Sequence, residues 1–138
     1  FSSPNLFHKQ WPYYNDLINI IKSKHSFEVV VAPGPNEIEY AKKIDAILIT
    51  KNTKALNIME LAGLIKKASF IISNDTGPAH MAAHLGAEGI VLFGYHTTPK
   101  KVSIETNKFK ALAVDNLSKL SAEKVYLEIK DKLKLLSN

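Results

Sequence analysis

Short runs of β-branched residues alternate along this chain with segments whose apolar residues recur at helical spacing. Four runs have the composition of buried strands, at residues 27–32, 46–50, 69–73 and 89–93, and residues 110–114 are a candidate edge strand. The runs are continuously apolar, which is typical of strands that are covered on both faces. Strands that alternate with helices predict an α/β fold, a Rossmann-like parallel sheet with helices on both faces.

The composition of the chain argues against several classes of protein. The 138 residues are enough for a single domain with a core, and the chain has no cysteine for a disulfide or a thiolate metal site. The formal net charge is +5, but the lysines are scattered and no aromatic residues interleave with them, which argues against nucleic-acid binding. No apolar run approaches the roughly 20 residues that a membrane-spanning helix needs, and no signal peptide is visible.

Helix starts are marked by capping signatures. Asn36 with Glu39, and Asn57 with Glu60, have the spacing of capping boxes, and Ser121 is a candidate cap for the last helix. The segment after Asn57 has one apolar face, formed by Ile58, Leu61, Ala62, Ile65 and Ala68. These signals predict helices after residues 36, 57 and 121.

Unusual residues collect where the predicted strands end. Ligands of open α/β sheets bind beyond the carboxyl ends of the strands. Three such ends carry glycine, proline or polar residues, at 33–37, 74–80 and 94–98. We expect these three loops to meet at one edge of the sheet and to form a ligand site.

The corner at residues 73–80, SNDTGPAH, offers donors for an anion. Gly77 permits close approach of the backbone, and Pro78 suits the first turn of the following helix. The N–H groups of a first helical turn and the positive end of the helix dipole attract phosphate. Thr76 and His80 can add a hydroxyl and an imidazole donor.

Asp75 fits this interpretation less easily, because a carboxylate repels phosphate. It would accept backbone N–H groups to hold the corner, or bind hydroxyls of a sugar. The alternative is purely structural: Asn74 and Asp75 cap the helix and bind no ligand.

The sequence lacks the motifs of several other enzyme and metal-binding classes. His80 and His84 are four residues apart, but Met81 stands where a zinc protease has glutamate, and no third ligand is evident. We therefore expect no metal. The phosphate-loop, dinucleotide-binding and serine-hydrolase motifs are also absent, which argues against an ATPase, a nicotinamide-dependent oxidoreductase and a serine hydrolase.

Four segments together resemble a known family. They are residues 9–12 (KQWP), residues 29–41 (VVVAPGPNEIEYA), the helix at 56–68 and residues 73–94. The last segment is the most specific, with an Asp-Thr/Ser-Gly-Pro-x-His-x-Ala-Ala core and a strand that ends in Phe-Gly. In this order, and over most of the chain, they resemble glycosyltransferase family 9, the bacterial ADP-heptose:lipopolysaccharide heptosyltransferases.

The resemblance implies a particular place in a larger enzyme. Proteins of this family have two Rossmann-like domains, an arrangement called GT-B, and residues 1–138 resemble the C-terminal, donor-binding domain. The implied activity is inverting, metal-independent transfer of heptose from ADP-heptose to the lipopolysaccharide inner core. The acceptor-binding N-terminal domain, with the catalytic base, would be absent from this sequence, so the 138 residues alone would be inactive.

The resemblance also assigns the residues of the leaving-group site. Asp75, Thr76 and Gly77 would contact the diphosphate and the sugar, with His80 beside them. Lys9 would neutralise the diphosphate charge and assist its departure, as the catalytic cation of this half. An ordinary surface lysine before a helix is the alternative for Lys9.

The resemblance also assigns the residues that would bind the nucleoside. Glu37 would hold the ribose hydroxyls, which leaves Glu39 to the helix cap, and Leu56 would pack on the adenine. Ser3, or alternatively Ser2, would serve the phosphate.

Departures from the family pattern leave some points open. AEGIV follows Leu85-Gly86, and FGYHTTP replaces a more usual Gly-Pro-Thr, so that His96, Thr97 and Thr98 would face the sugar and its identity stays open. The family's first strand of this domain would lie just before Phe1. Two alternative functions are a nucleotide-binding module without transfer activity and another GT-B enzyme, such as a UDP-sugar transferase or epimerase.

The implied partners are a nucleotide-sugar donor and, through the absent domain, a lipopolysaccharide-core acceptor. No cofactor is expected. The location expected is the cytoplasm, where the basic surplus would help to hold a full enzyme at the anionic inner face of the inner membrane.

Overall fold

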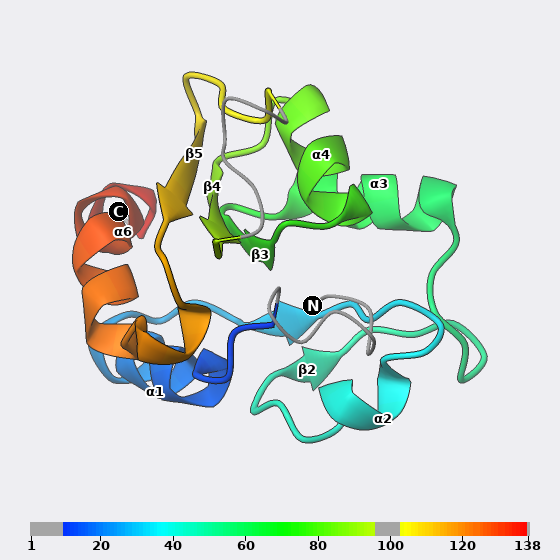
Figure 1. The fold of residues 1–138 in the computed structure, drawn as a ribbon. Helices are drawn as coiled ribbons and strands as arrows, with labels where there is room; N and C mark the ends of the chain where they lie inside the picture. The colour runs from blue at the N-terminus through cyan, green and yellow to red at the C-terminus, as the bar shows by residue number, and fades with distance from the viewer. Residues whose placement is uncertain (1–9, 96–102, 138) are drawn as a thin grey trace. The chain divides into compact units, whose positions relative to one another are not determined.

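The computed structural model describes residues 10–95 and 103–137 (Figure 1). The chain divides into two compact units. The first unit comprises Phe1–Trp11 and Asn57–Leu117, and the second comprises Pro12–Leu56 and Ser118–Asn138.

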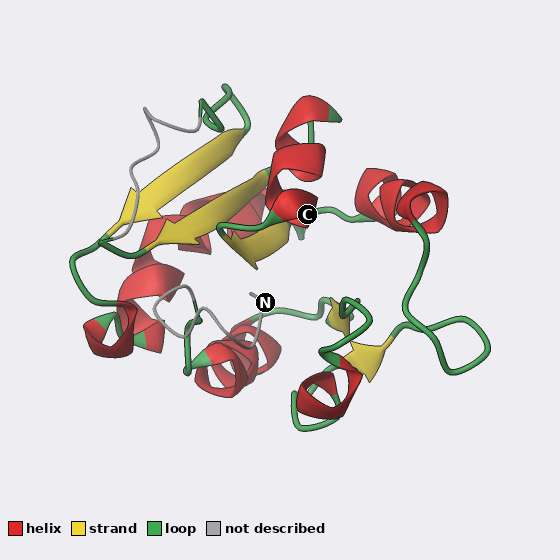
Figure 2. Ribbon diagram, turned by 45° about the vertical axis from the view of Figure 1, so that its right-hand side comes forward, coloured by secondary structure: helices red, strands yellow, loops and turns green. Residues whose placement is uncertain are grey.

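The first unit is built on a parallel sheet. It contains α3 (Ile58–Lys67), β3 (Ile71–Asn74), α4 (Gly77–His84), β4 (Gly89–Phe93) and β5 (Phe109–Ala113). The strand order is β3-β4-β5, and Figure 2 shows the three strands side by side. Asn74 pairs with Leu92, and Phe93 pairs with Ala113, so the carboxyl ends of the strands lie along one edge.

Small side chains let α4 lie close to this sheet. Its buried residues, Ala79, Ala82 and Ala83, are spaced as one helical face. They pack in one core cluster with Val91 and Phe93 of β4, Phe109 of β5 and Ile65 of α3. All five residues of β4 are buried, as expected for the central strand of a covered parallel sheet.

The start of α3 and the end of α4 have the geometry that their local residues favour. The predicted capping box of α3 is confirmed: Asn57 Oδ1 accepts from Glu60 N (2.8 Å), and Glu60 Oε1 accepts from Asn57 N (3.0 Å). At the end of α4, Gly86 has φ +74°, and Ala87 N donates to Ala82 O at 3.0 Å, which is a Schellman termination. The predicted apolar face of α3 is only partly correct, because Ile58 is 72% exposed.

The second unit contains a two-stranded parallel sheet and a helix pair. Its elements are α1 (Tyr14–Lys24), β1 (Val30–Val31), α2 (Ile38–Ala41), β2 (Ile47–Leu48) and α6 (Ala122–Leu136). The short 3-10 helix η2 (Leu117–Lys119) precedes α6. α1 and α6 pack together, each through a buried apolar face; these faces are Leu17, Ile18 and Ile21 of α1 and Ala122, Val125, Ile129 and Leu133 of α6.

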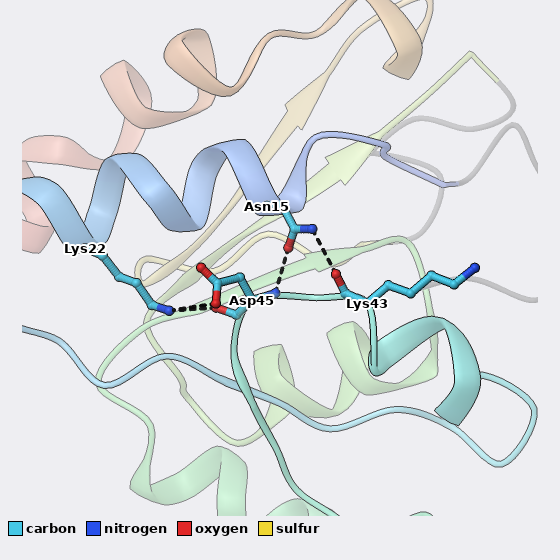
Figure 3. Close-up of polar contacts among 4 residues, drawn as sticks. All are labelled: Asn15, Lys22, Lys43 and Asp45. Atoms are coloured by element: carbon cyan, nitrogen blue, oxygen red, sulfur yellow. Dashed lines mark hydrogen bonds and ion pairs between the residues drawn. The ribbon is translucent and has the colours of Figure 1, made fainter.

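Asn15 fastens the turn before β2 to α1 (Figure 3). Its amide nitrogen donates to Lys43 O at 2.9 Å, and its amide oxygen accepts from Asp45 N at 2.7 Å. Lys22, two turns along α1, donates to Asp45 O at 2.8 Å and pairs with its carboxylate at 3.3 Å. The turn that leads from α2 into β2 is therefore held by the side chains of one helix.

The predicted α/β class with parallel strands is confirmed. The described strands pair as two sheets, β1-β2 and β3-β4-β5, rather than as one. Ser121 caps α6, as predicted, by accepting from Lys124 N at 3.1 Å. The capping box predicted at Asn36 is wrong: α2 begins after Glu37, which makes no side-chain cap bond, and Glu39 instead pairs with Lys42 at 2.7 Å.

Across residues 10–95 and 103–137, no helix combines the length and the apolarity that crossing a bilayer requires.

Gly89 should not tolerate a side chain. A Cβ there would collide with the backbone oxygen of Ile71 and lie 2.5 Å from the Phe109 ring. We expect Gly89→Ala to lower the free energy of unfolding by about 1–3 kcal/mol, measured by urea denaturation. Gly63→Ala is the matched control, because a Cβ there meets nothing within 4 Å and alanine favours the helix by about 0.5–1 kcal/mol. Equal effects of the two changes would contradict this packing.

Asn15→Ala should loosen the turn before β2, because it removes both hydrogen bonds of the amide. We expect a loss of about 1–2 kcal/mol in the free energy of unfolding. Lys43→Ala is the control: the turn uses the backbone of Lys43, and no bond of its side chain is involved in these contacts, so the stability of this variant should stay within about 0.5 kcal/mol of wild type. A loss as large for Lys43→Ala as for Asn15→Ala would contradict the role of the amide.

Candidate functional site

The predicted corner lies where β3 ends and α4 begins. Thr76 is the N-cap residue of α4, with extended backbone angles (φ −144°, ψ 169°), and Gly77 is the first helical residue. Pro78 occupies the second helical position. The structural alternative that Asn74 or Asp75 is the N-cap residue is therefore wrong.

The hydroxyl of Thr76 does not cap the helix that it precedes. It makes no capping hydrogen bond, and its Oγ1 instead donates to Asn74 O at 3.4 Å. Ser73 Oγ donates to the same carbonyl at 2.9 Å and lies 3.4 Å from Thr76 Oγ1. The two hydroxyls thus bond to the end of the strand, and the side chain of Thr76 leaves the start of α4 uncapped.

Space remains in front of this turn. Gly77 is exposed, its φ is not positive, and a Cβ built there would meet nothing within 4 Å. Backbone strain therefore does not explain the glycine. A ligand that approaches the backbone would explain it.

Asp75 and His80 form a pair inside the corner. Asp75 Oδ1 lies 3.6 Å from His80 Nε2. The side chain of Asp75 is 8% exposed, whereas that of His80 is 36% exposed. The carboxylate is thus buried beneath an imidazole that reaches the surface.

The start of a second predicted loop lies on the same edge. Because Asn74 pairs with Leu92, Gly94 and Tyr95 leave β4 beside the corner, and Tyr95 is 72% exposed. Residues 96–98, with the candidate sugar contacts His96, Thr97 and Thr98, lie outside the described residues. The first unit therefore contains the corner and the beginning of the 94–98 loop.

Lys9 and Ser3, the remaining candidates for the phosphate, also lie outside the described part of the chain. Their predicted roles stay predictions.

The histidine pair of α4 does not gather further ligands. His84 is exposed at the end of the helix. Among residues 10–95 and 103–137, no three histidine, cysteine, aspartate or glutamate side chains are grouped so that they could hold a metal ion.

Glu37 belongs to the second unit, in the loop after β1. Its Oε2 accepts from Gly34 N at 3.4 Å, while Glu37 N donates to Gly34 O at 3.1 Å. The carboxylate therefore closes its own turn. Glu37 is therefore a half-buried acid in the loop that follows β1, and its role at the ribose stays a prediction.

Two tyrosines near Glu37 were not foreseen as part of this region. Burial raises the pKa of the Tyr14 phenol, and the charges of Tyr40 and Glu37 raise it further. Burial also raises the pKa of Tyr40. Both phenols are thus neutral hydroxyls at physiological pH. The neighbourhood of Tyr14 with Glu37 has no signal in the spacing of the sequence.

A hollow of about 500 Å³ lies beside α2 and the end of β2 in the second unit. It is lined by Pro35, Asn36, Ile38, Glu39, Lys42, Leu48, Thr50 and Thr53. Neither Glu37 nor Leu56 lines it. Leu56 is half-buried at the end of the loop that leads toward α3.

The fold and the corner together define a Rossmann-like α/β chain with a polar strand-to-helix turn at the carboxyl edge of its sheet. The model of glycosyltransferase family 9 (heptosyltransferase) matches residues 3–130, and the chain belongs to this family. The resemblance inferred from the motifs is confirmed.

Comparisons with individual proteins point to the same family. The chain is 33% identical over 88 residues to the lipopolysaccharide core heptosyltransferase OpsX of Haemophilus influenzae, a match that covers 60% of this chain and 25% of that protein. Its fold is similar to E. coli heptosyltransferase WaaC with ADP-2-deoxy-2-fluoro heptose (TM-score 0.78, 24% identity, 91% of this chain and 39% of that one). It is also similar to E. coli ADP-heptose lps heptosyltransferase II (TM-score 0.78, 19% identity, 93% and 43%). The chain thus spans less than half the length of these relatives.

Proposed function

We propose that this chain is the ADP-heptose-binding part of an inverting heptosyltransferase that adds heptose to the lipopolysaccharide inner core without a metal ion. Membership of glycosyltransferase family 9 supports the reaction class. The similar WaaC structures, which contain ADP or a fluorinated ADP-heptose, support the donor.

The observation that carries the proposal is the start of α4 at Gly77, which its N-cap side chain leaves uncapped. Thr76 does not cap it, and Gly77 leaves the space in front of it empty. N–H groups at a helix start, with the positive end of the dipole, favour a diphosphate. His80 follows in the same turn and brings a further N–H donor.

The chemistry of transfer requires such donors. When the bond between the sugar and the diphosphate breaks, negative charge develops on the leaving group and the sugar takes on oxocarbenium character. Donors that are already in place stabilise the developing charge without reorganisation. In this chain Gly77 N at the start of α4 and the imidazole of His80 supply N–H groups, because Pro78 has none and Ala79 N donates to Thr76 O. Lys9 supplies a full positive charge to the departing diphosphate, with Ser3 as a further phosphate contact.

Two residues are proposed for the nucleoside of the donor. Glu37, fixed by its bond to Gly34 N, accepts from the ribose hydroxyls, and Leu56 packs on the adenine. The lipopolysaccharide acceptor and the catalytic base belong to a part of the enzyme beyond these 138 residues. The full enzyme works at the cytoplasmic face of the inner membrane, where its basic surplus favours the anionic surface.

ADP should bind to the 138-residue chain in a calorimetric titration. We expect tighter binding of ADP than of UDP or GDP, because Leu56 and its surroundings are assigned to adenine. Equal affinity for the three nucleotides would contradict the adenine assignment, and tighter binding of UDP would favour a UDP-sugar enzyme.

Gly77→Ala should separate binding from folding. The new methyl group lies in open space in the free protein, so the free energy of unfolding should be unchanged or slightly higher. The same methyl group would obstruct a diphosphate at the backbone, and we expect the affinity for ADP to fall about tenfold or more. Gly63→Ala, also exposed and in a helix, should leave ADP affinity unchanged. Full ADP affinity of Gly77→Ala would contradict the site.

Lys9→Ala should lower the affinity for ADP by roughly 10- to 100-fold, the usual value of a hydrogen bond to a charged group. Lys66→Ala, which removes an exposed lysine near the end of α3, is the control and should bind ADP like wild type. Similar losses in the two variants would show that general positive charge, rather than Lys9, attracts the nucleotide.

A further inference from the structure

β5 is an outer strand of the three-stranded sheet, and among the strands of the described residues it pairs only with β4. On the side that faces β4, Val114 N donates to Phe93 O at 3.0 Å. Because backbone groups point to alternate sides along a strand, Phe109, Ala111 and Ala113 direct their N–H and C=O groups away from β4. A strand edge of this kind is a template for pairing with another chain.

A short segment at residues 104–106 occupies part of this outer edge. Ala111 N donates to Glu105 Oε1 at 2.9 Å, and Phe109 N donates to Thr106 Oγ1 at 2.9 Å. Thr106 N in turn donates to Phe109 O at 2.9 Å. Three outward groups of β5 are therefore bonded to residues 104–106, which we call the strap.

The strap is anchored in the core of the first unit. Ile104 is 1% exposed and belongs to the same core cluster as Phe109. The next residue, Glu105, is thereby placed beside β5. Thr106 Oγ1 also accepts from Lys108 N at 3.2 Å, which fastens the turn between the strap and the strand.

Glu105 fills a position that a neighbouring strand would fill with a backbone carbonyl. An ionised carboxylate accepts hydrogen bonds and donates none. It therefore satisfies Ala111 N and offers no donor to the carbonyls of a further strand. Charged side chains at the edge of a sheet are a common means of preventing such pairing.

A second copy of this chain fits the edge of β5 once the strap is open. In an antiparallel pair centred on Ala111, each copy presents the same backbone groups to the other, and a contact of this kind closes as a dimer. Lys110 then lies opposite Leu112 of the second copy rather than opposite another lysine. Like charges are therefore not opposed across the pair.

We infer that the outer edge of β5 is a pairing surface for a second copy of this chain, and that Glu105 keeps this surface closed. A chain with the strap in place does not pair through β5, whereas a chain with an open strap does. The inference is independent of the proposed function, because no nucleotide takes part in it.

Glu105→Ala tests the inference on the 138-residue chain. Sedimentation equilibrium over a concentration series measures self-association, and hydrogen exchange of the Ala111 amide measures the state of the edge. At low concentration this amide should exchange about tenfold or more faster than in wild type, because its acceptor is gone. At higher concentration the variant should dimerise about tenfold or more tightly than wild type, and the amide should regain protection.

Two further variants show whether the effect belongs to this edge. Glu128→Ala is the matched control, because it makes the same substitution at an exposed position of α6, and it should associate like wild type. Adding Ala111→Pro to Glu105→Ala removes the outward N–H, and proline is tolerated on an edge strand where the N–H faces outward. Self-association of this double variant should return to the wild-type level.

Three results would overturn the inference. They are unchanged exchange of the Ala111 amide in Glu105→Ala, self-association of this variant that equals wild type, and added association that survives Ala111→Pro. Thr106→Val covers the case in which Glu105→Ala does not fold, because it removes the acceptor of Phe109 N from the same edge. It should also associate more tightly than wild type, and wild-type behaviour of Thr106→Val in that case would overturn the inference.

Discussion

The parallel pairing of β3 with β4 is the constraint on which the site depends. It sets Asn74 beside Leu92 and brings the ends of both strands to one edge of the sheet. Gly89 permits this pairing, because it passes close to the backbone of Ile71 and the ring of Phe109. The alanine face of α4 then packs on the same strands, and the start of the helix is thereby fixed at the edge where ligands of such sheets bind.

The strands of the first unit, two helix caps and the family could be predicted from the sequence, because local residue patterns determine them. The apolar runs predicted the strands of the first unit closely, and most closely for β4, whose five residues are all buried. The signatures at Asn57 and Ser121 specified caps that the structure contains. The family was evident from the order and spacing of its motifs, and the match over residues 3–130 confirms it.

The rest depends on contacts that spacing does not reveal. Asn36 and Glu39 have the pattern of a capping box, but Glu39 pairs with Lys42, and α2 begins one residue later than that cap requires. The burial of Asp75 under His80 follows from the tight packing of α4, not from the order of the two residues along the chain. The neighbourhood of Tyr14 with Glu37 joins segments that are distant in sequence. In each case tertiary structure selects among options that local sequence leaves open.

The proposed function depends on the diphosphate binding at the start of α4. The most direct measurement is a ¹H–¹⁵N correlation spectrum of the 138-residue chain during titration with ADP. We expect the largest amide shifts on Gly77, Ala79 and His80, at the start of α4. Saturable binding with those three amides unmoved, and the largest shifts elsewhere, would contradict it.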